Sequence, residues 1–423
     1  MCYNLDRIWK PATPRMEPQK RGKICCVGSV LRGGIMYCNK TAAEVSNASI
    51  LLKNAYSRAQ EQAKKCLNGM NFSVPASTNT AAAPSAAEAV EKLESSLSRQ
   101  LNIPHVCATG GGRAAGLLAL RTLSAPILGE RSLRRGDEVI TVGLHANAIC
   151  ELTALGVTPV LADVMLPQYN IDVRELERAL SPNTRAVMLS HTLGYPFNLK
   201  TVRNFCNDYE LWLIEDSREA MGAAYDFDGT RYAVGTVGDI GIGSTASLSP
   251  DGQGCGALYT RDDTLSAIAR EILAGDADLS PDAEQAATDV TRLKTLTDAE
   301  GHRHAAAWLI QALRSSVGFL TLPEALPEAH PAPWALPLTC GEDVDTGALM
   351  EALRQRGVPF RALLAAEDAE QLASLAARGC CRPIGDLPVT RRILADTLVI
   401  PLPLGITEET LASAVKAVEE ALS

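Results

Sequence analysis

The feature that most restricts the fold is a series of short, almost wholly apolar runs separated by stretches with helical periodicity. These runs occupy residues 139–142, 160–162, 186–189 and 211–214. A strand without polar alternation is buried on both faces, so the runs indicate a mostly parallel sheet with helices on each side. The sequence therefore predicts an α/β protein whose ligands gather at the carboxyl ends of the strands.

The length of the chain points to more than one domain. With 423 residues, of which 46% are hydrophobic, the chain can bury a large core and is expected to divide. We expect an N-terminal arm and linker (1–85), a large α/β domain (86–280), an interdomain helix (281–315) and a small α+β C-terminal domain (316–423).

Charge and cysteine usage exclude several classes of partner. The net charge of −9 argues against general binding of nucleic acid or membrane surfaces, which require clustered basic charge. There is no long apolar run, and the first residues lack the order of a signal peptide, so a cytoplasmic protein is expected. The 12 cysteines are expected to be reduced thiols, and the pairs Cys25-Cys26 and Cys380-Cys381 lack the spacing of a metal site.

A glycine-rich turn, Gly110-Gly111-Gly112-Arg113, follows an apolar segment and opens into a helix. Consecutive glycines let backbone N–H groups converge at a helix N-terminus, where the dipole favours an anion such as phosphate. Taken alone, the turn fits equally well with a flexible connection.

An acidic residue, Asp216, lies at the end of the run 211–214. A carboxylate buried at a strand end requires a cationic partner, and the protonated pyridine nitrogen of vitamin-B6 cofactors is one such partner. Helix capping by Asp216 is an equally good interpretation of the spacing alone.

Two histidines also follow predicted strands. His145 comes after the run 139–142, where its ring could stack on a flat cofactor, although a lone histidine is more often a surface or capped residue. His191 follows the run 186–189 and could hydrogen-bond a cofactor oxygen or tie down a loop.

Together these segments resemble the DegT/DnrJ/EryC1/StrS sugar aminotransferase family, and within it the CDP-4-keto-6-deoxyglucose-3-dehydrase (RfbH-like) branch. The resemblance runs from about Ala89 to the C-terminus, and is carried by residues 128–131, 136–142, 169–172, 186–194, 211–216 and 360–364. It implies the fold type I of PLP-dependent transferases, with a large, mostly parallel α/β domain and a smaller α+β C-terminal domain.

The resemblance also assigns site residues. It places Gly112, Arg113 and Ala114 on the turn that cradles the cofactor phosphate, and Ser244 on a phosphate-binding serine. It places His145 on the ring-stacking aromatic, Asp216 on the partner of the pyridine nitrogen, and Glu219 near the ring hydroxyl.

The chain departs from the family pattern at the position of the residue that acts as the base. The aminotransferases carry a cofactor-binding lysine and the 3-dehydrases a histidine where this chain has Ser249, and no lysine occurs between Lys200 and Lys294. A serine hydroxyl is not basic near neutral pH unless a second group activates it. The iron–sulfur cysteines of the dehydrase are also missing, and by the resemblance the segment that carries most of them is expected to be deleted between residues 272 and 281.

The expected function is an enzyme of deoxysugar or lipopolysaccharide biosynthesis that binds PLP or PMP non-covalently and acts on a nucleotide-activated keto-deoxysugar. Ser249, His145 and Glu219 are its candidate catalytic residues, and neither a metal nor an iron–sulfur cluster is expected. The alternatives are a catalytically silent paralogue that pairs with an active family member, and an aminotransferase-like activity. Active sites of the family lie at a two-fold interface, so a homodimer or a heterodimer with a paralogue is expected.

Overall fold

The computed structural model describes residues 46–67, 86–246, 253–295, 299–403 and 406–422. Its main sheet has eight strands, in the order β1 (His105–Thr109), β11 (Gly256–Thr260), β10 (Ile240–Ser244), β7 (Trp212–Asp216), β6 (Thr184–Ser190), β2 (Glu138–Val142), β3 (Thr158–Ala162) and β16 (Arg382–Pro383). Only β11 runs against its neighbours, so the predicted mostly parallel α/β sheet is present.

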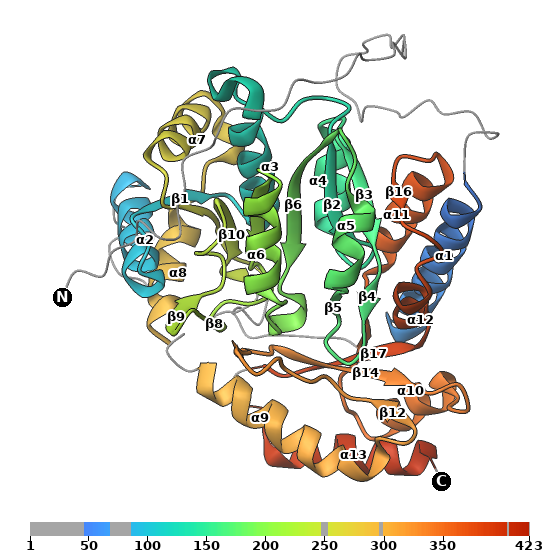
Figure 1. Ribbon diagram of the computed structural model, residues 1–423. Helices are drawn as coiled ribbons and strands as arrows, with labels where there is room; N and C mark the ends of the chain where they lie inside the picture. Colours follow the sequence, from blue (N-terminus) through green and yellow to red (C-terminus); the bar gives the residue numbers. More distant parts are fainter. Residues whose placement is uncertain (1–45, 68–85, 247–252, 296–298, 404–405, 423) are drawn as a thin grey trace. The chain divides into compact units, whose positions relative to one another are not determined.

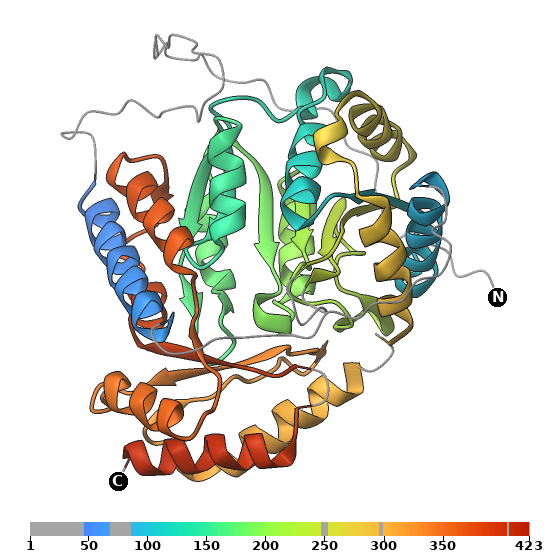
Figure 2. The same ribbon diagram turned by 180° about the vertical axis from the view of Figure 1, so that it is seen from behind.

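Helices cover both faces of this sheet (Figures 1 and 2). The face seen in Figure 2 is covered by helices that contact one another in succession: α7 (Asp263–Gly275), α3 (Gly112–Leu123), α4 (Ala146–Ala154), α11 (Ala366–Ala377) and α1 (Asn47–Leu67). The opposite face carries α6 (Leu199–Asp208) and α5 (Leu176–Ala179), with α2 (Ala86–Leu101) and α8 (Ala283–Thr295) packed together at the β1 end.

The N-terminal part of the chain was expected to be an arm and linker, and this is corrected for its described segment. Helix α1 packs against α11 and α12 (Pro388–Asp396), and Leu52 and Tyr56 belong to the main core. The Tyr56 hydroxyl donates a hydrogen bond of 2.8 Å to the carbonyl of Gly143, just beyond β2. This helix is therefore part of the folded body, while residues 1–45 and 68–85 lie outside the described residues.

A second core forms around a smaller sheet of β12 (Leu320–Thr321), β14 (Ala335–Cys340), β17 (Thr397–Pro401) and β15 (Arg361–Ala362). Its helices are α9 (Ala299–Ala312), α10 (Thr346–Gln355) and α13 (Glu408–Leu422), of which α9 and α13 lie along the bottom of Figure 1. Short strands complete the fold: β8 (Ala224–Phe227) with β9 (Thr230–Ala233) and β13 (Ala329–His330), and β4 (Val164–Met165) with β5 (Asn170–Ile171).

Two expected domain limits differ from the structure. The segment 281–315 contains two helices that serve different cores, because α8 packs with α2 and α9 packs in the second core. Within 316–423, β16 joins the main sheet and α11 and α12 pack in its core. None of the described helices is long and apolar enough to cross a membrane.

Candidate functional site

A pocket of about 160 Å³ lies where β2, β6 and β7 end, at the predicted edge of the sheet. Three sequence-predicted residues line it, namely His145, Asp216 and Glu219. Arg218, Arg361 and further residues complete the lining: Leu144, Ala146, Asn147, Ser190, Thr192, Leu193, Leu363, Leu364, Ala365 and Asp368. No lysine occurs among these described lining residues.

Strand alternation decides which side chains reach the pocket. Ser190 on β6 and Asp216 on β7 are register partners and project to the same face, toward α3 and α4. The residues next to them, His191 and Glu215, project to the other face and pair at 3.1 Å. His191 is fully buried and stacked on Phe197, with ring centroids 4.3 Å apart. The expectation that His191 contacts a cofactor is therefore wrong in this structure, because the side chain lies behind the sheet.

Asp216 is held by Arg218, two residues further along the chain. Its Oδ1 accepts hydrogen bonds from the Arg218 backbone N–H at 3.1 Å and from Nε at 2.9 Å, and its Oδ2 accepts one from Nη2 at 2.6 Å. Arg218 also donates from Nη1 to Glu151 Oε1 at 2.6 Å, which links a second carboxylate from α4. We call Asp216, Arg218 and Glu151 the buried triad, since none is more than 6% exposed.

The two carboxylates of the buried triad respond differently to their surroundings. Burial opposes ionisation of Asp216, but the adjoining guanidinium holds the pKa of Asp216 below its ordinary value. For Glu151 burial prevails and raises the pKa to about 7, although Arg218 counteracts it. The charge of Arg218 is thus compensated mainly by Asp216, while Glu151 can hold a proton near neutral pH.

His145 is fixed as a neutral ring. Its Nδ1 accepts the Ser190 backbone N–H at 3.3 Å, so the ring proton must be on Nε2, which lies 3.1 Å from Thr192 Oγ1. Thr192 donates its own hydroxyl proton to Asn170 Oδ1 at 3.0 Å. Burial lowers the pKa of His145 to about 4. With both nitrogens engaged, His145 can present a ring face to the pocket but has no free base nitrogen.

Glu219 is a lining carboxyl whose surroundings favour the protonated form. Burial raises the pKa of Glu219 above its ordinary value, and the nearby Arg361 only partly offsets this. Its Oε2 accepts the Leu193 backbone N–H at 3.4 Å. Arg361 lies over the Trp334 ring at 4.9 Å and donates from Nη1 to the carbonyls of Ala362 and Leu363, so its position is fixed.

The predicted phosphate turn lies beside the pocket but does not line it. Gly112 begins α3, and a Cβ there would come within 3.2 Å of Ser244 Cβ and 2.8 Å of Arg218 Cδ. Gly112 and Ser244 are thus neighbours, and the Arg218 side chain lies against Gly112. Arg113 is exposed and Ala114 is half-buried, and neither belongs to the pocket lining.

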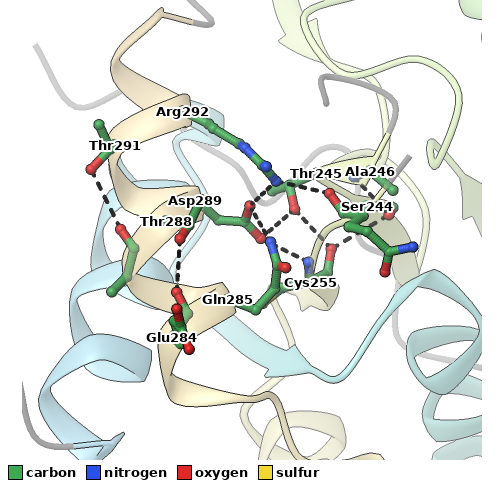
Figure 3. A network of polar contacts seen from close by, with 12 residues as sticks. Ser244, Thr245, Ala246, Cys255, Glu284, Gln285, Thr288, Asp289, Thr291 and Arg292 are labelled. Atoms are coloured by element: carbon green, nitrogen blue, oxygen red, sulfur yellow. Dashed lines mark hydrogen bonds and ion pairs between the residues drawn. The ribbon is translucent and has the colours of Figure 1, made fainter. Parts of the chain in front are cut away.

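Ser249, which stands where the family has a lysine or a histidine, lies outside the described residues. The residues on both sides of its segment are held by hydrogen bonds to one carboxylate. Asp289 on α8 is fully buried, and its Oδ2 accepts hydrogen bonds from Thr245 Oγ1 at 2.6 Å and from the Cys255 N–H at 2.7 Å. Its Oδ1 accepts from Gln285 and Arg292 (Figure 3). Helix α8 therefore fixes the described residues on either side of the segment 247–252.

Sequence reasoning missed Arg218 and Glu151, the two partners of Asp216. A signal was present for Glu151, because it is the sole Asp, Glu, Lys or Arg between Glu138 and Asp163. A single acid within so apolar a stretch requires a buried cation or proton. Arg218 gave a weaker signal, because an arginine after a strand end is usually solvated.

The expected B6 cofactor fits these residues poorly at its ring nitrogen. Asp216 receives three hydrogen bonds from Arg218, and a Ser190 hydroxyl hydrogen bond further lowers its pKa. An ionised carboxylate offers about four acceptor positions, so a pyridinium N–H would have to displace one of these donors. Among the described residues, no group of three or more His, Cys, Asp or Glu side chains is arranged to hold a metal ion.

Comparisons with known proteins agree with the resemblance seen in the sequence. The model of the DegT/DnrJ/EryC1/StrS aminotransferase family matches residues 75–276. The lipopolysaccharide biosynthesis protein RfbH of Salmonella typhimurium is 32% identical over 377 residues, which cover 78% of this chain and 84% of that protein. The dTDP-4-dehydro-2,6-dideoxy-D-glucose 3-dehydratase of Saccharopolyspora spinosa is 36% identical over 160 residues, or 38% of this chain and 33% of that enzyme.

Solved structures confirm the fold predicted from the sequence. E. coli GDP-4-keto-6-deoxy-D-mannose-3-dehydratase, determined with bound hydrated PLP, matches with a TM-score of 0.69 and 16% identity over 83% of this chain and all of that one (100%). The aminotransferase TlmJ from Streptoalloteichus hindustanus matches with a TM-score of 0.68 and 22% identity over 79% of this chain and 90% of its own.

Proposed function

Because this chain belongs to the DegT/DnrJ/EryC1/StrS aminotransferase family, we propose that it binds a nucleotide-activated keto-deoxysugar in the strand-end pocket. Its place would be in cytoplasmic deoxysugar biosynthesis, such as that of lipopolysaccharide. The observation that carries the proposal is the convergence on one pocket of His145, which follows β2, with Asp216 and Glu219, which lie at and just beyond the end of β7. No covalent link through a lysine is part of the proposal, because the matching position is Ser249.

The lining offers the groups that a sugar needs. Glu219 and Asp368 can accept or, when protonated, donate hydrogen bonds to hydroxyl groups, since burial raises the pKa of both carboxyls. Asn147 adds an amide, and Arg361 brings a fixed positive charge next to Glu219. The flat face of His145 supplies an apolar wall on which a ring can lie.

Two versions of this function differ in chemistry. In the first, the chain is a 3-dehydratase-like enzyme that binds PLP or PMP non-covalently, which is favoured by the retained neighbours Gly112 and Ser244. In the second, it is a silent paralogue that pairs with an active family member, which is favoured by the engaged carboxylate of Asp216 and nitrogens of His145. Aminotransferase-like activity ranks below both, because it normally requires the lysine.

Isothermal titration with CDP-, dTDP-, GDP- and UDP-linked hexoses tests the shared part of the proposal. We expect at least one of them to bind with a dissociation constant of about 1 mM or tighter. Arg361→Ala should weaken that binding about tenfold or more, because a hydrogen bond to a charged group contributes about 1.5–3 kcal/mol.

Lys200→Ala is the matched control for loss of a positive charge. Lys200 is exposed and pairs with Asp228, which is not a lining residue of the pocket. The affinity of the Lys200→Ala variant for the sugar nucleotide should equal that of the wild type. Failure of every sugar nucleotide to bind the wild type at several times the expected dissociation constant would contradict the proposal.

A further inference from the structure

The buried triad satisfies Asp216 from within the chain. Three Arg218 donors reach Asp216 at 3.1, 2.9 and 2.6 Å, and the backbone donor cannot move away without refolding the turn after β7. Arg218 Nη1 is itself held by Glu151 Oε1 at 2.6 Å and by the Gly112 carbonyl at 3.2 Å. The guanidinium is therefore fixed from three sides and is not a surface side chain that happens to fold inward.

The neighbouring helix leaves space for this arrangement at two glycines. A Cβ at Gly112 would lie 2.8 Å from Arg218 Cδ, so a larger residue would collide with the arginine stem. A Cβ at Gly116 would overlap the Glu151 carboxylate. Gly116 lies in the interior of α3, where glycine is unfavourable relative to alanine. Gly112 is thus explained by the Arg218 side chain itself, and Gly116 by its partner Glu151.

We infer that Arg218 occupies the place on Asp216 that this fold offers to the protonated nitrogen of a B6 cofactor, so that the pocket receives its sugar ligand without PLP or PMP. The inference deepens the proposed function and rests on it for the identity of the sugar ligand. It favours the silent paralogue, because the electron-withdrawing group of the family chemistry would be missing.

Titration with PMP tests the inference, because PMP lacks the aldehyde that reacts with surface lysines. Wild-type protein should show no saturable absorbance change up to about 1 mM PMP. The double variant Arg218→Ala/Glu151→Gln removes the cation and one of the two carboxylates, and should bind PMP at least about tenfold more tightly than the wild type. Adding Asp216→Asn to this double variant should abolish the gained binding.

The double variant Arg203→Ala/Asp239→Asn is the matched control. It removes another buried arginine, which pairs with Asp239 at 3.0 Å, and should leave PMP binding absent. Circular dichroism verifies that each variant is folded. Should the Arg218 double variant fail to fold, the wild type still decides, because saturable PMP binding with Arg218 in place overturns the inference.

The inference is also overturned if the Arg218→Ala/Glu151→Gln variant folds but binds PMP no better than the wild type does. Titration of the same wild-type sample with sugar nucleotides separates the two proposals. Sugar binding without PMP supports both, whereas the absence of sugar binding, with PMP binding gained only in the double variant, rejects the proposed function and leaves the role of Arg218 standing.

Discussion

Two consecutive carboxylates on β7, Glu215 and Asp216, are both enclosed, yet they are stabilised in different ways on opposite faces of the sheet. Glu215 accepts backbone N–H groups of Gly235 at 2.9 Å and Val237 at 2.8 Å, another from Gly238, and the His191 ring. Asp216 depends on Arg218, whose guanidinium also serves Glu151.

The difference is between a carboxylate that anchors a loop and one that balances a charge. Three of the donors to Glu215 are backbone N–H groups set by the path of the chain, so these three persist whatever side chain stands at position 191. The balance around Asp216 depends on one side chain shared between two acids, which makes Arg218 the residue on which this face depends.

The largest expected effect on the free energy of unfolding comes from replacing the nitrogen-bearing partner of each carboxylate with an apolar side chain of similar size. Arg218→Met leaves two buried carboxylates without their cation and should lower the free energy of unfolding by about 3–5 kcal/mol. His191→Phe keeps the stack on Phe197 and leaves three backbone donors on Glu215, so about 1–2 kcal/mol is expected. Urea unfolding measures both. Equal losses would show that the two faces are not stabilised differently.

A smaller effect concerns the pH dependence of stability. Burial raises the pKa of Glu151 to about 7, so between its unfolded pKa and this value the folded protein binds the extra proton. Stability from this group is complete below the unfolded pKa and is lost as the pH rises to about 7, by roughly 3 kcal/mol in all.

Glu151→Gln removes this titration and provides the comparison. The stability of the wild type relative to the variant should therefore fall between about pH 4.5 and pH 7. His145 acts in the opposite direction, because its lowered pKa costs stability on acidification, but it is common to both proteins and cancels in the difference. A flat difference curve would mean that Glu151 stays ionised throughout.

Much of this fold could be predicted from the sequence, because the apolar runs are strands and the strand ends meet at one edge. Strand β7 ends at Asp216 as expected. Helix α1 was missed because its 21 residues belong to a basic N-terminal segment that precedes a low-complexity stretch, whereas its burial depends on contacts with α11, about 300 residues away.

The site was predicted less well, for a reason that strand geometry makes clear. Position 190 faces the pocket, so position 191 must face away, and this alternation already argues against a cofactor role for His191. The apolar surroundings of Glu151 gave a signal, but its pairing with Arg218, 67 residues away along the chain, is set by the tertiary fold and could not be read from the sequence.

The smallest expected effect tests whether Gly116 and Glu151 are coupled. Glycine-to-alanine changes inside helices usually stabilise by about 0.5–1 kcal/mol, but here the new Cβ would overlap a carboxylate that Arg218 holds in place. Gly116→Ala should therefore destabilise the wild type by about 1 kcal/mol and become neutral or stabilising once Glu151→Ala has cleared the space. The coupling in this double-mutant cycle, measured by urea unfolding, should be about 1–2 kcal/mol. Strictly additive effects would instead show that Glu151 can move away at no cost, and that the triad is looser than its contacts indicate.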